Sequence, residues 1–235
     1  MKKVLVIMMI LLAVTASAVF AKQGFTLRGG FSYDFVNVKA ADSETDINAG
    51  KIWRANAFGA EFGVTYNFSD SFLVYGDSSV GFFNKFKIGD TEVTKEGFDK
   101  LFFFAQTSHA GAAYDFDFDS ALDLQVGGGL AVEYTRMVLT DTDKSESEYD
   151  SYRLEYGVMA VGFGLYANVG YSLSDRVSIT ATVHPDFMFV SNNVTSIEKT
   201  TTVDKTSLSE TVTTVTVGTA FSFKFNASVG VTFKF

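Results

Sequence analysis

Apolar and polar residues alternate with a period of two along most of this chain, most clearly in its last fifteen residues. In "FSFKFNASVGVTFKF", residues 221–235, every odd-numbered position is apolar, and the positions between them are polar or small. A period of two places successive side chains on opposite faces of a strand. This stretch therefore predicts a β-strand with one apolar face.

Seven further stretches show the same alternation, and together they predict an all-β domain. The expected strands cover residues 24–36, 55–68, 72–84, 101–116, 121–136, 154–173 and 176–190, and the last strand, 221–235, begins near Val215. Short turns at 69–71, 117–120 and 174–175 alternate with longer polar loops at 37–54, 85–100, 137–153 and 191–213. Long loops at one end and short turns at the other predict an antiparallel up-and-down meander with an even number of strands.

The amino-terminal residues indicate export. Lys2 and Lys3 precede an apolar run from Val4 to Val14, and small residues then offer cleavage after Ala18 or Ala21. We favour Ala21, which predicts a signal peptide at 1–21 and one domain at 22–235. An uncleaved transmembrane helix is the alternative, but the run is short for the roughly 20 residues such a helix needs.

Composition narrows the class of protein further. Removing residues 1–21 removes two lysines and no acid, so the net charge changes from −8 to −10, which argues against nucleic acid as a partner. An exported chain without cysteine cannot rely on disulfides. With 25 Phe and 47% apolar residues, the chain has either a large core or a surface that does not face water.

Two kinds of eight-stranded barrel fit this pattern, and they differ in which face points inward. A soluble lipocalin-like barrel encloses a ligand with its apolar face, whereas an outer-membrane barrel turns that face to lipid. Eight strands leave an interior just wide enough for side chains. The polar face here is rich in small residues, among them Gly59, Gly127 and Gly162, and the apolar face is bulky with aromatic residues near strand ends. We therefore predict an eight-stranded antiparallel transmembrane β-barrel in the outer membrane.

The mature chain resembles small eight-stranded bacterial outer-membrane proteins of the OmpX, OmpW and opacity-protein type. The resemblance rests on the signal peptide, the absence of cysteine, the alternation of long and short connections and the final "VGVTFKF". It implies that the barrel-assembly machinery and outer-membrane lipid are partners. It also implies an assembly signal at alternate positions, formed by Val229, Val231, Phe233 and Phe235.

Charged and polar residues on the predicted inner face are the candidate site residues. The expected lumen network comprises Arg28, Asp34, Glu61, Asp77, His109, Asp123, Glu133, Arg176, His184, Asp186 and Lys224. Buried charges must be paired or hydrated, so a network that fills the lumen is the first interpretation. A narrow, cation-preferring pore lined by excess acid is the second.

Histidine, proline and tryptophan each invite a separate expectation. His109 and His184 are the only histidines and lie at similar distances from their short turns, but no third metal ligand has a defined spacing. Pro185 removes a ladder hydrogen bond in mid-strand, which predicts a bulge or local opening. Trp53, near a loop base, is expected to be an interfacial anchor. We expect no metal, cofactor or catalytic site, since no motif of these kinds is present.

Three functions remain open at this point. The first is a structural and surface-interaction role, adhesin-like, in which the long loops contact host, matrix or neighbouring cells. The second is transport through a narrow pore or small-molecule channel. The third is a soluble periplasmic lipid-binding barrel.

Overall fold

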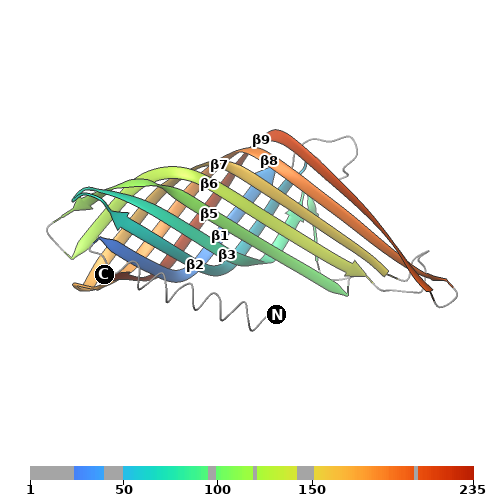
Figure 1. Cartoon of the computed structure of the whole chain (residues 1–235), viewed down its shortest axis with the longest axis horizontal. Coiled ribbons are helices and arrows are strands. Elements are labelled where there is room, and N and C mark those ends of the chain that lie inside the picture. The colour runs from blue at the N-terminus through green and yellow to red at the C-terminus, as the bar shows by residue number, and fades with distance from the viewer. Residues whose placement is uncertain (1–23, 40–49, 95–98, 119–120, 142–150, 204–205) are drawn as a thin grey trace.

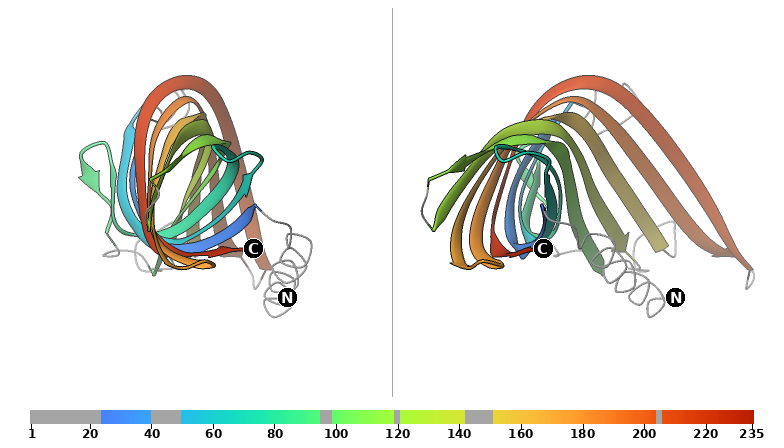
Figure 2. Two further views of the ribbon diagram at one scale, coloured as in Figure 1. Left: turned by 90° about the vertical axis from the view of Figure 1, so that its left-hand side faces the viewer. Right: turned by 60° about the vertical axis from the view of Figure 1, so that its left-hand side comes forward.

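The computed structural model describes residues 24–39, 50–94, 99–118, 121–141, 151–203 and 206–235. Eight long strands form one closed antiparallel ring in the order β2-β1-β9-β8-β7-β6-β5-β3, and β2 pairs with β3 to complete it (Figures 1 and 2). In the described part of the chain, no helix is long and apolar enough to span a membrane. The predicted all-β, eight-stranded up-and-down barrel is confirmed.

The strands differ greatly in length, because several continue far beyond the ring. The ring strands are β1 (Phe25–Lys39), β2 (Ile52–Asn67), β3 (Phe72–Ile88), β5 (Lys100–Asp117), β6 (Leu122–Asp141), β7 (Ser151–Ser174), β8 (Val177–Val203) and β9 (Thr206–Lys234). A two-residue strand, β4 (Thr91–Glu92), pairs only with the end of β3. A tilted strand needs about 9–11 residues to cross a bilayer, so β8 and β9, with 27 and 29 residues, are much longer than crossing requires.

The ring closes between the first and last strands. β1 and β9 pair antiparallel from Thr26 opposite Lys234 to Asn37 opposite Phe223, and the amide of Phe235 donates to the carbonyl of Phe25 at 3.0 Å. Closure satisfies the backbone groups of both edges, which is the condition for a β-structure in hydrocarbon. The short turns lie at this end, which in barrels of this architecture faces the periplasm.

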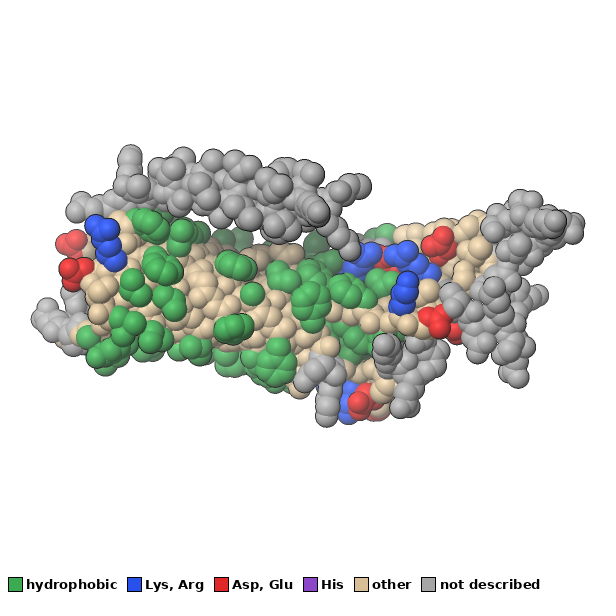
Figure 3. Space-filling view, turned by 90° about the horizontal axis from the view of Figure 1, so that it is seen from below, with side chains coloured by type: hydrophobic (Ala, Val, Ile, Leu, Met, Phe, Trp, Pro, Cys, Tyr) green, Lys and Arg blue, Asp and Glu red, His purple; other side chains and the backbone are tan. Residues whose placement is uncertain are grey.

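Side chains divide between the two faces as the alternation predicts. Large apolar residues are exposed on the outside of every ring strand, for example Phe31 at 85%, Phe62 at 66% and Leu130 at 66%. Polar and small residues face inward. Figure 3 shows the apolar side chains as a broad belt, with charged side chains gathered beyond its ends. An apolar belt around a polar interior is an arrangement suited to lipid, not to water.

The expected loop at 191–213 is wrong, because these residues continue β8 and β9 as a paired hairpin. The ladder runs on to Val203 opposite Thr206, and the two strands project beyond the barrel (Figure 1). The segment is rich in Thr and Val, residues whose branched Cβ favours strands. Its polarity suggests a loop, but polar residues on both faces are equally compatible with a hairpin outside the membrane.

The other connections are shorter than expected for the same reason. β1 reaches Lys39 and β2 begins at Ile52, within the loop expected at 37–54; β6 continues to Asp141 and β7 begins at Ser151, within 137–153. Within 85–100, β3 reaches Ile88 and β4 follows. The signal peptide expected at 1–21 lies outside the described residues.

Pro185 interrupts one ladder locally. β7 and β8 are paired at Gly164 opposite Asp186 and again at Ala167 opposite Val183, without a change of register, but no pairing is formed at the two positions between them. Proline has no amide hydrogen to donate, so this local opening follows from the residue itself. The predicted opening at Pro185 is confirmed.

Close strand approach makes one inward-facing glycine difficult to replace. A Cβ on Gly59 of β2 would collide with the carbonyl oxygen of Val80 and lie 2.6 Å from the Cα of Gly81 on β3. We expect Gly59→Ala to lower the free energy of unfolding by about 1–3 kcal/mol, the usual cost of overpacking. The measurement is urea unfolding in detergent micelles, followed by fluorescence of Trp53, the only tryptophan.

Gly29 is the matched control, because a Cβ there would meet no atom within 4 Å. Gly29→Ala should change the free energy of unfolding by less than about 0.5 kcal/mol. Equal destabilisation by the two substitutions would contradict the close approach of β2 and β3 at Gly59.

Candidate functional site

The lumen gathers most of the charged residues predicted from the sequence. Nine of the eleven are buried inside the barrel: Arg28, Asp34, Glu61, Asp77, His109, Glu133, His184, Asp186 and Lys224. Asp123 is partly exposed at the periplasmic rim, where its carboxylate lies 3.6 Å from Lys234. Arg176 is exposed in the turn between β7 and β8, so its predicted place in the network is wrong. Arg176 precedes β8, so the alternation of that strand does not determine the direction in which its side chain points.

Arg28 on β1 is the cation of the layer nearest the periplasm. Its Nη2 lies 2.7 Å from the carboxylate of Glu61 on β2 and 2.5 Å from that of Asp77 on β3. Nη1 donates to the side chains of Tyr166 and Asn168 on β7, each at 3.4 Å. One guanidinium thus links β1 to β2, β3 and β7. The several N–H donors of arginine, fixed in one plane, allow a single side chain to make these contacts.

The two histidines form a stacked pair in the middle of the lumen. The rings of His109 on β5 and His184 on β8 have centroids 4.0 Å apart and are inclined by only 6°. Nε2 of His109 lies 3.0 Å from the carboxylate of Asp186, and Nε2 of His184 lies 3.3 Å from that of Asp77. Their similar distances from the short turns thus correspond to a similar depth in the barrel. The described residues contain no group of three or more ligands that could hold a metal ion.

Lys224 on β9 is the cation of the layer above the histidines. Its side chain is completely buried, and its Nζ lies 3.1 Å from Asp34 on β1. The same carboxylate accepts hydrogen bonds from Asn226 at 2.8 Å and Ser79 at 3.3 Å. Since β1 and β9 are the strands that close the ring, this ion pair lies across the closing seam.

Acids outnumber permanent cations among the buried groups of the described residues. The buried carboxylates are five, those of Asp34, Glu61, Asp77, Glu133 and Asp186, against one guanidinium and one ammonium. Buried charge is costly unless it is paired, and each of the two buried cations lies beside a carboxylate. The stacked histidines each lie beside a carboxylate, that of Asp186 for His109 and that of Asp77 for His184. Together these side chains occupy the interior and link strands on opposite sides of the ring.

Apolar side chains fill the lumen toward its external end, a feature that the sequence interpretation missed. Trp53 on β2 is fully buried, stacks on Tyr156 of β7 at 4.2 Å and meets Phe86 of β3 edge-on at 4.8 Å. The expectation of an interfacial anchor is therefore wrong. Trp53 has the same parity as Gly59 and is carried inward by the alternation of β2, a signal that extending the predicted strand by two residues would have revealed.

The periplasmic end of the lumen contains a cavity of about 260 Å³. Asp115 lies on its wall and accepts hydrogen bonds from Asn67 and Gln125, both at 3.4 Å. Asp123 and Lys234 also line this cavity. Of the residues expected to form the assembly signal, Val229, Val231 and Phe233 point outward from β9, whereas Phe235 follows the end of β9 and lines the cavity; the four are 38–60% exposed.

The barrel is similar to solved structures of outer-membrane proteins. Neisserial surface protein A (NspA) is 17% identical, with a TM-score of 0.51 over 91% of this chain and 98% of that one. OprG from Pseudomonas aeruginosa is 16% identical, with a TM-score of 0.50 over 91% and 97%. A major outer membrane protein from Thermus thermophilus is 13% identical, with a TM-score of 0.54 over 88% and 99%. No family model matches the chain, and no curated protein matches its sequence.

These similarities concern the fold. Taken with the outward apolar belt and the charged interior, they identify the chain as an outer-membrane β-barrel protein. The predicted resemblance to small eight-stranded barrels is confirmed at the level of fold. The soluble lipid-binding barrel is not supported, because it requires the apolar face to point inward.

Removing Lys224 should destabilise the barrel strongly. Lys224→Met leaves Asp34 buried without its cation, and we expect the free energy of unfolding to fall by about 3–5 kcal/mol. Urea unfolding in micelles measures the change. The double variant Asp34→Asn/Lys224→Met should recover much of the loss, because it removes both charges.

Lys234→Met provides the control. This lysine lies at the periplasmic rim, and its side chain is 41% exposed. An exposed pair contributes less than about 1 kcal/mol, so Lys234→Met should remain close to the parent. Similar losses for the two lysine variants would show that burial of the Lys224–Asp34 pair has no special importance.

Proposed function

We propose that the protein binds other surfaces. In this proposal the barrel, whose lumen is filled, anchors a β-hairpin that extends outside the cell. The observation that carries this proposal is the extension of β8 and β9. Their last outward aromatic residues are Phe189 and Phe221, whose rings are 6.1 Å apart, and no aromatic residue occurs between 190 and 220. Beyond Phe189 and Phe221, β8 and β9 pair for more than ten further positions, up to Val203 opposite Thr206.

A paired hairpin is a better presenting element than an unstructured loop of the same length. Its ladder fixes the backbone, so a partner that binds it causes less loss of conformational entropy. Its side chains are Thr, Ser and Val with a few charges, and Val212 and Val215 are more than half exposed. Such a surface offers hydroxyl hydrogen bonds and small apolar contacts to host, matrix or neighbouring-cell surfaces.

The interior supports an anchoring role. Charged pairs and aromatic rings occupy the lumen at successive levels, and Glu61, Glu133, His184, Asp186 and Lys224 are at most 2% exposed. A lumen filled in this way stiffens the wall on which the hairpin stands. We further propose, from the resemblance, that Val229, Val231, Phe233 and Phe235 present the assembly signal to the barrel-assembly machinery.

Excising the hairpin tests the proposal. Asn193 and Thr216 are ladder partners, so residues 194–215 can be replaced by Asn-Gly, a favoured two-residue hairpin turn. The variant should fold, as judged by its heat-modifiable migration on gels, and should bind host cells, matrix proteins and neighbouring cells less than the parent. Unchanged binding to every surface that the parent binds would overturn the proposal.

Transport is the second candidate, and the periplasmic cavity of about 260 Å³ lined by Asp115 and Asp123 is the observation in its favour. A pore requires this cavity to continue past Arg28, the histidine pair and the aromatic cluster. We expect planar bilayers containing the folded protein to show no conductance steps, because these groups fill the path. Reproducible cation-selective steps would instead support a transport role.

A further inference from the structure

A groove runs along the lipid-facing side of β1, β2 and β3. Its external half has a volume of about 610 Å³ and is walled by aromatic side chains, including those of Phe31, Phe58 and Phe82. Ala60 lies on its floor. The small residue leaves the backbone of the barrel wall exposed between large side chains, so the belt is hollowed here.

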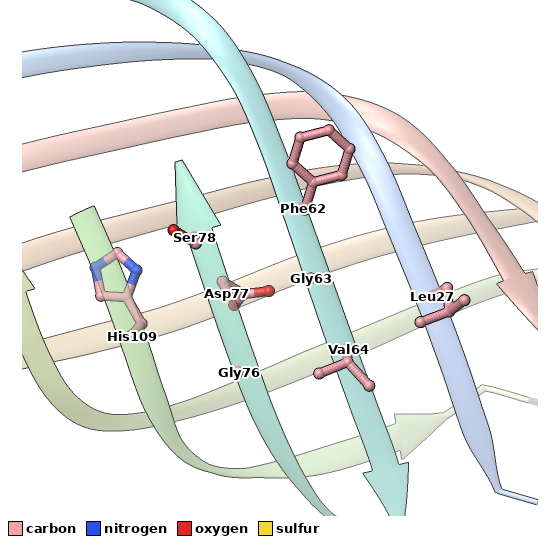
Figure 4. Close-up of a pocket in the computed structure, with 8 residues that line it drawn as sticks. All are labelled: Leu27, Phe62, Gly63, Val64, Gly76, Asp77, Ser78 and His109. Atoms are coloured by element: carbon pink, nitrogen blue, oxygen red, sulfur yellow. The ribbon is translucent and has the colours of Figure 1, made fainter. Parts of the chain in front are cut away.

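The periplasmic half of the groove has a volume of about 430 Å³ and shares Phe62 with the external half. Figure 4 shows Phe62 and Val64 on β2 and Leu27 on β1 standing around Gly63, with Gly76 and Ser78 on β3 beside them. The two hollows share Phe62 and follow one another along these strands, and the periplasmic one is also lined by Asp77 and His109 of the lumen network.

Two basic residues lie beyond the external end of this groove. Arg54 on β2 and Lys87 on β3 are exposed and directly opposite each other in the ladder. Arg54 is also opposite Asn37 of β1, so three polar side chains form a row across the strands that wall the groove. Like charges directly opposite one another are destabilising in a sheet.

A β-bulge creates this opposition. Phe58 is opposite Phe82, but the register shifts between Asn56 and Ala57, and Arg54 is consequently opposite Lys87 instead of Phe86. The same shift carries Phe86 into the lumen, where it is buried against Trp53. Bulges re-aim side chains in this way, often beside functional sites.

Two basic residues elsewhere on the external rim share an acidic partner. On the wall formed by β6 and β7, Arg136 and Arg153 approach the carboxylate of Glu155, at 2.6 and 3.4 Å. Within the described residues, Arg54 and Lys87 have no ion pair, although Glu92 of β4 is opposite Lys87 in the ladder. The wall that carries the groove therefore presents two adjacent basic side chains that form no ion pair within the described residues, with Glu92 as the acid opposite one of them.

We propose that this surface is a binding site for an anionic, phosphate-bearing lipid of the external leaflet. The groove holds an acyl chain against Phe31, Phe58 and Phe82, and the phosphate bridges Arg54 and Lys87. Two observations select a lipid: the groove opens into the hydrocarbon belt, and the unpaired positive charges lie at the end where a headgroup would be. A phosphate between the two basic side chains also removes their mutual repulsion.

Native mass spectrometry of the folded chain in micelles, titrated with phosphatidic acid, tests this proposal. Arg54→Gln/Lys87→Gln should bind the lipid roughly 30-fold more weakly, as expected when two basic side chains near a membrane surface are lost. Arg136→Gln/Arg153→Gln, on the wall formed by β6 and β7, should bind like the parent. Ala60→Leu should also weaken binding, because it fills the groove and leaves the basic pair intact.

Two further measurements distinguish a lipid headgroup from free inorganic phosphate as the source of the bound phosphate. Phosphatidylcholine, whose headgroup has no net charge, should bind more weakly than phosphatidic acid, and inorganic phosphate should not displace the bound lipid. Equal binding by the parent and the Arg54/Lys87 variant would overturn the proposal. Displacement by inorganic phosphate at concentrations similar to that of the lipid would overturn the lipid assignment as well.

Discussion

Hydrogen bonding of the backbone in hydrocarbon is the constraint on which the rest of this structure depends. A strand in lipid has no water to satisfy its amide and carbonyl groups, so the sheet must close on itself. Here the ring closes by the pairing of β1 with β9, the first and last of its eight strands. An eight-stranded ring leaves a narrow interior, and the inward-facing residues must therefore be small or well paired.

The charged lumen follows from this geometry. Inward positions cannot all be glycine, and a polar face enclosed by the barrel has to compensate its own charges. Arg28 joins β1 to β2, β3 and β7, while Lys224 joins β9 to β1 across the closing seam. Both cations connect strands that are distant in the sequence. The network therefore stabilises the closed ring.

The external end is governed by different requirements. Once a strand has left the membrane, its two faces need not differ, and β8 and β9 continue as a hairpin of mixed composition, rich in Thr, Ser and Val. The bulge between β2 and β3 occurs near this boundary, where it turns Phe86 inward and brings Arg54 opposite Lys87. The inward position of Phe86 and the outer basic pair are thus two consequences of one register shift.

The alternation is sufficient to predict which residues face the lumen along most strands, since parity in a regular strand is preserved from end to end. It cannot identify ion partners: the contact of Arg28 with Asp77 depends on stagger between strands, which period two does not contain. It fails for Arg176, which lies in a turn, and for residues 191–213, where polarity resembles a loop. The prediction for Trp53 is wrong because the expected strand begins two residues too late.

The apolar face of every ring strand meets lipid, and the polar face is enclosed by the barrel. The chain has no cysteine, so single-cysteine variants from 221 to 233 of β9, spin-labelled in lipid vesicles, test this most directly. Labels at odd positions should be accessible to oxygen dissolved in the bilayer, and labels at even positions should be shielded by the barrel. Oxygen accessibility at the even positions, or no alternation at all, would contradict the account.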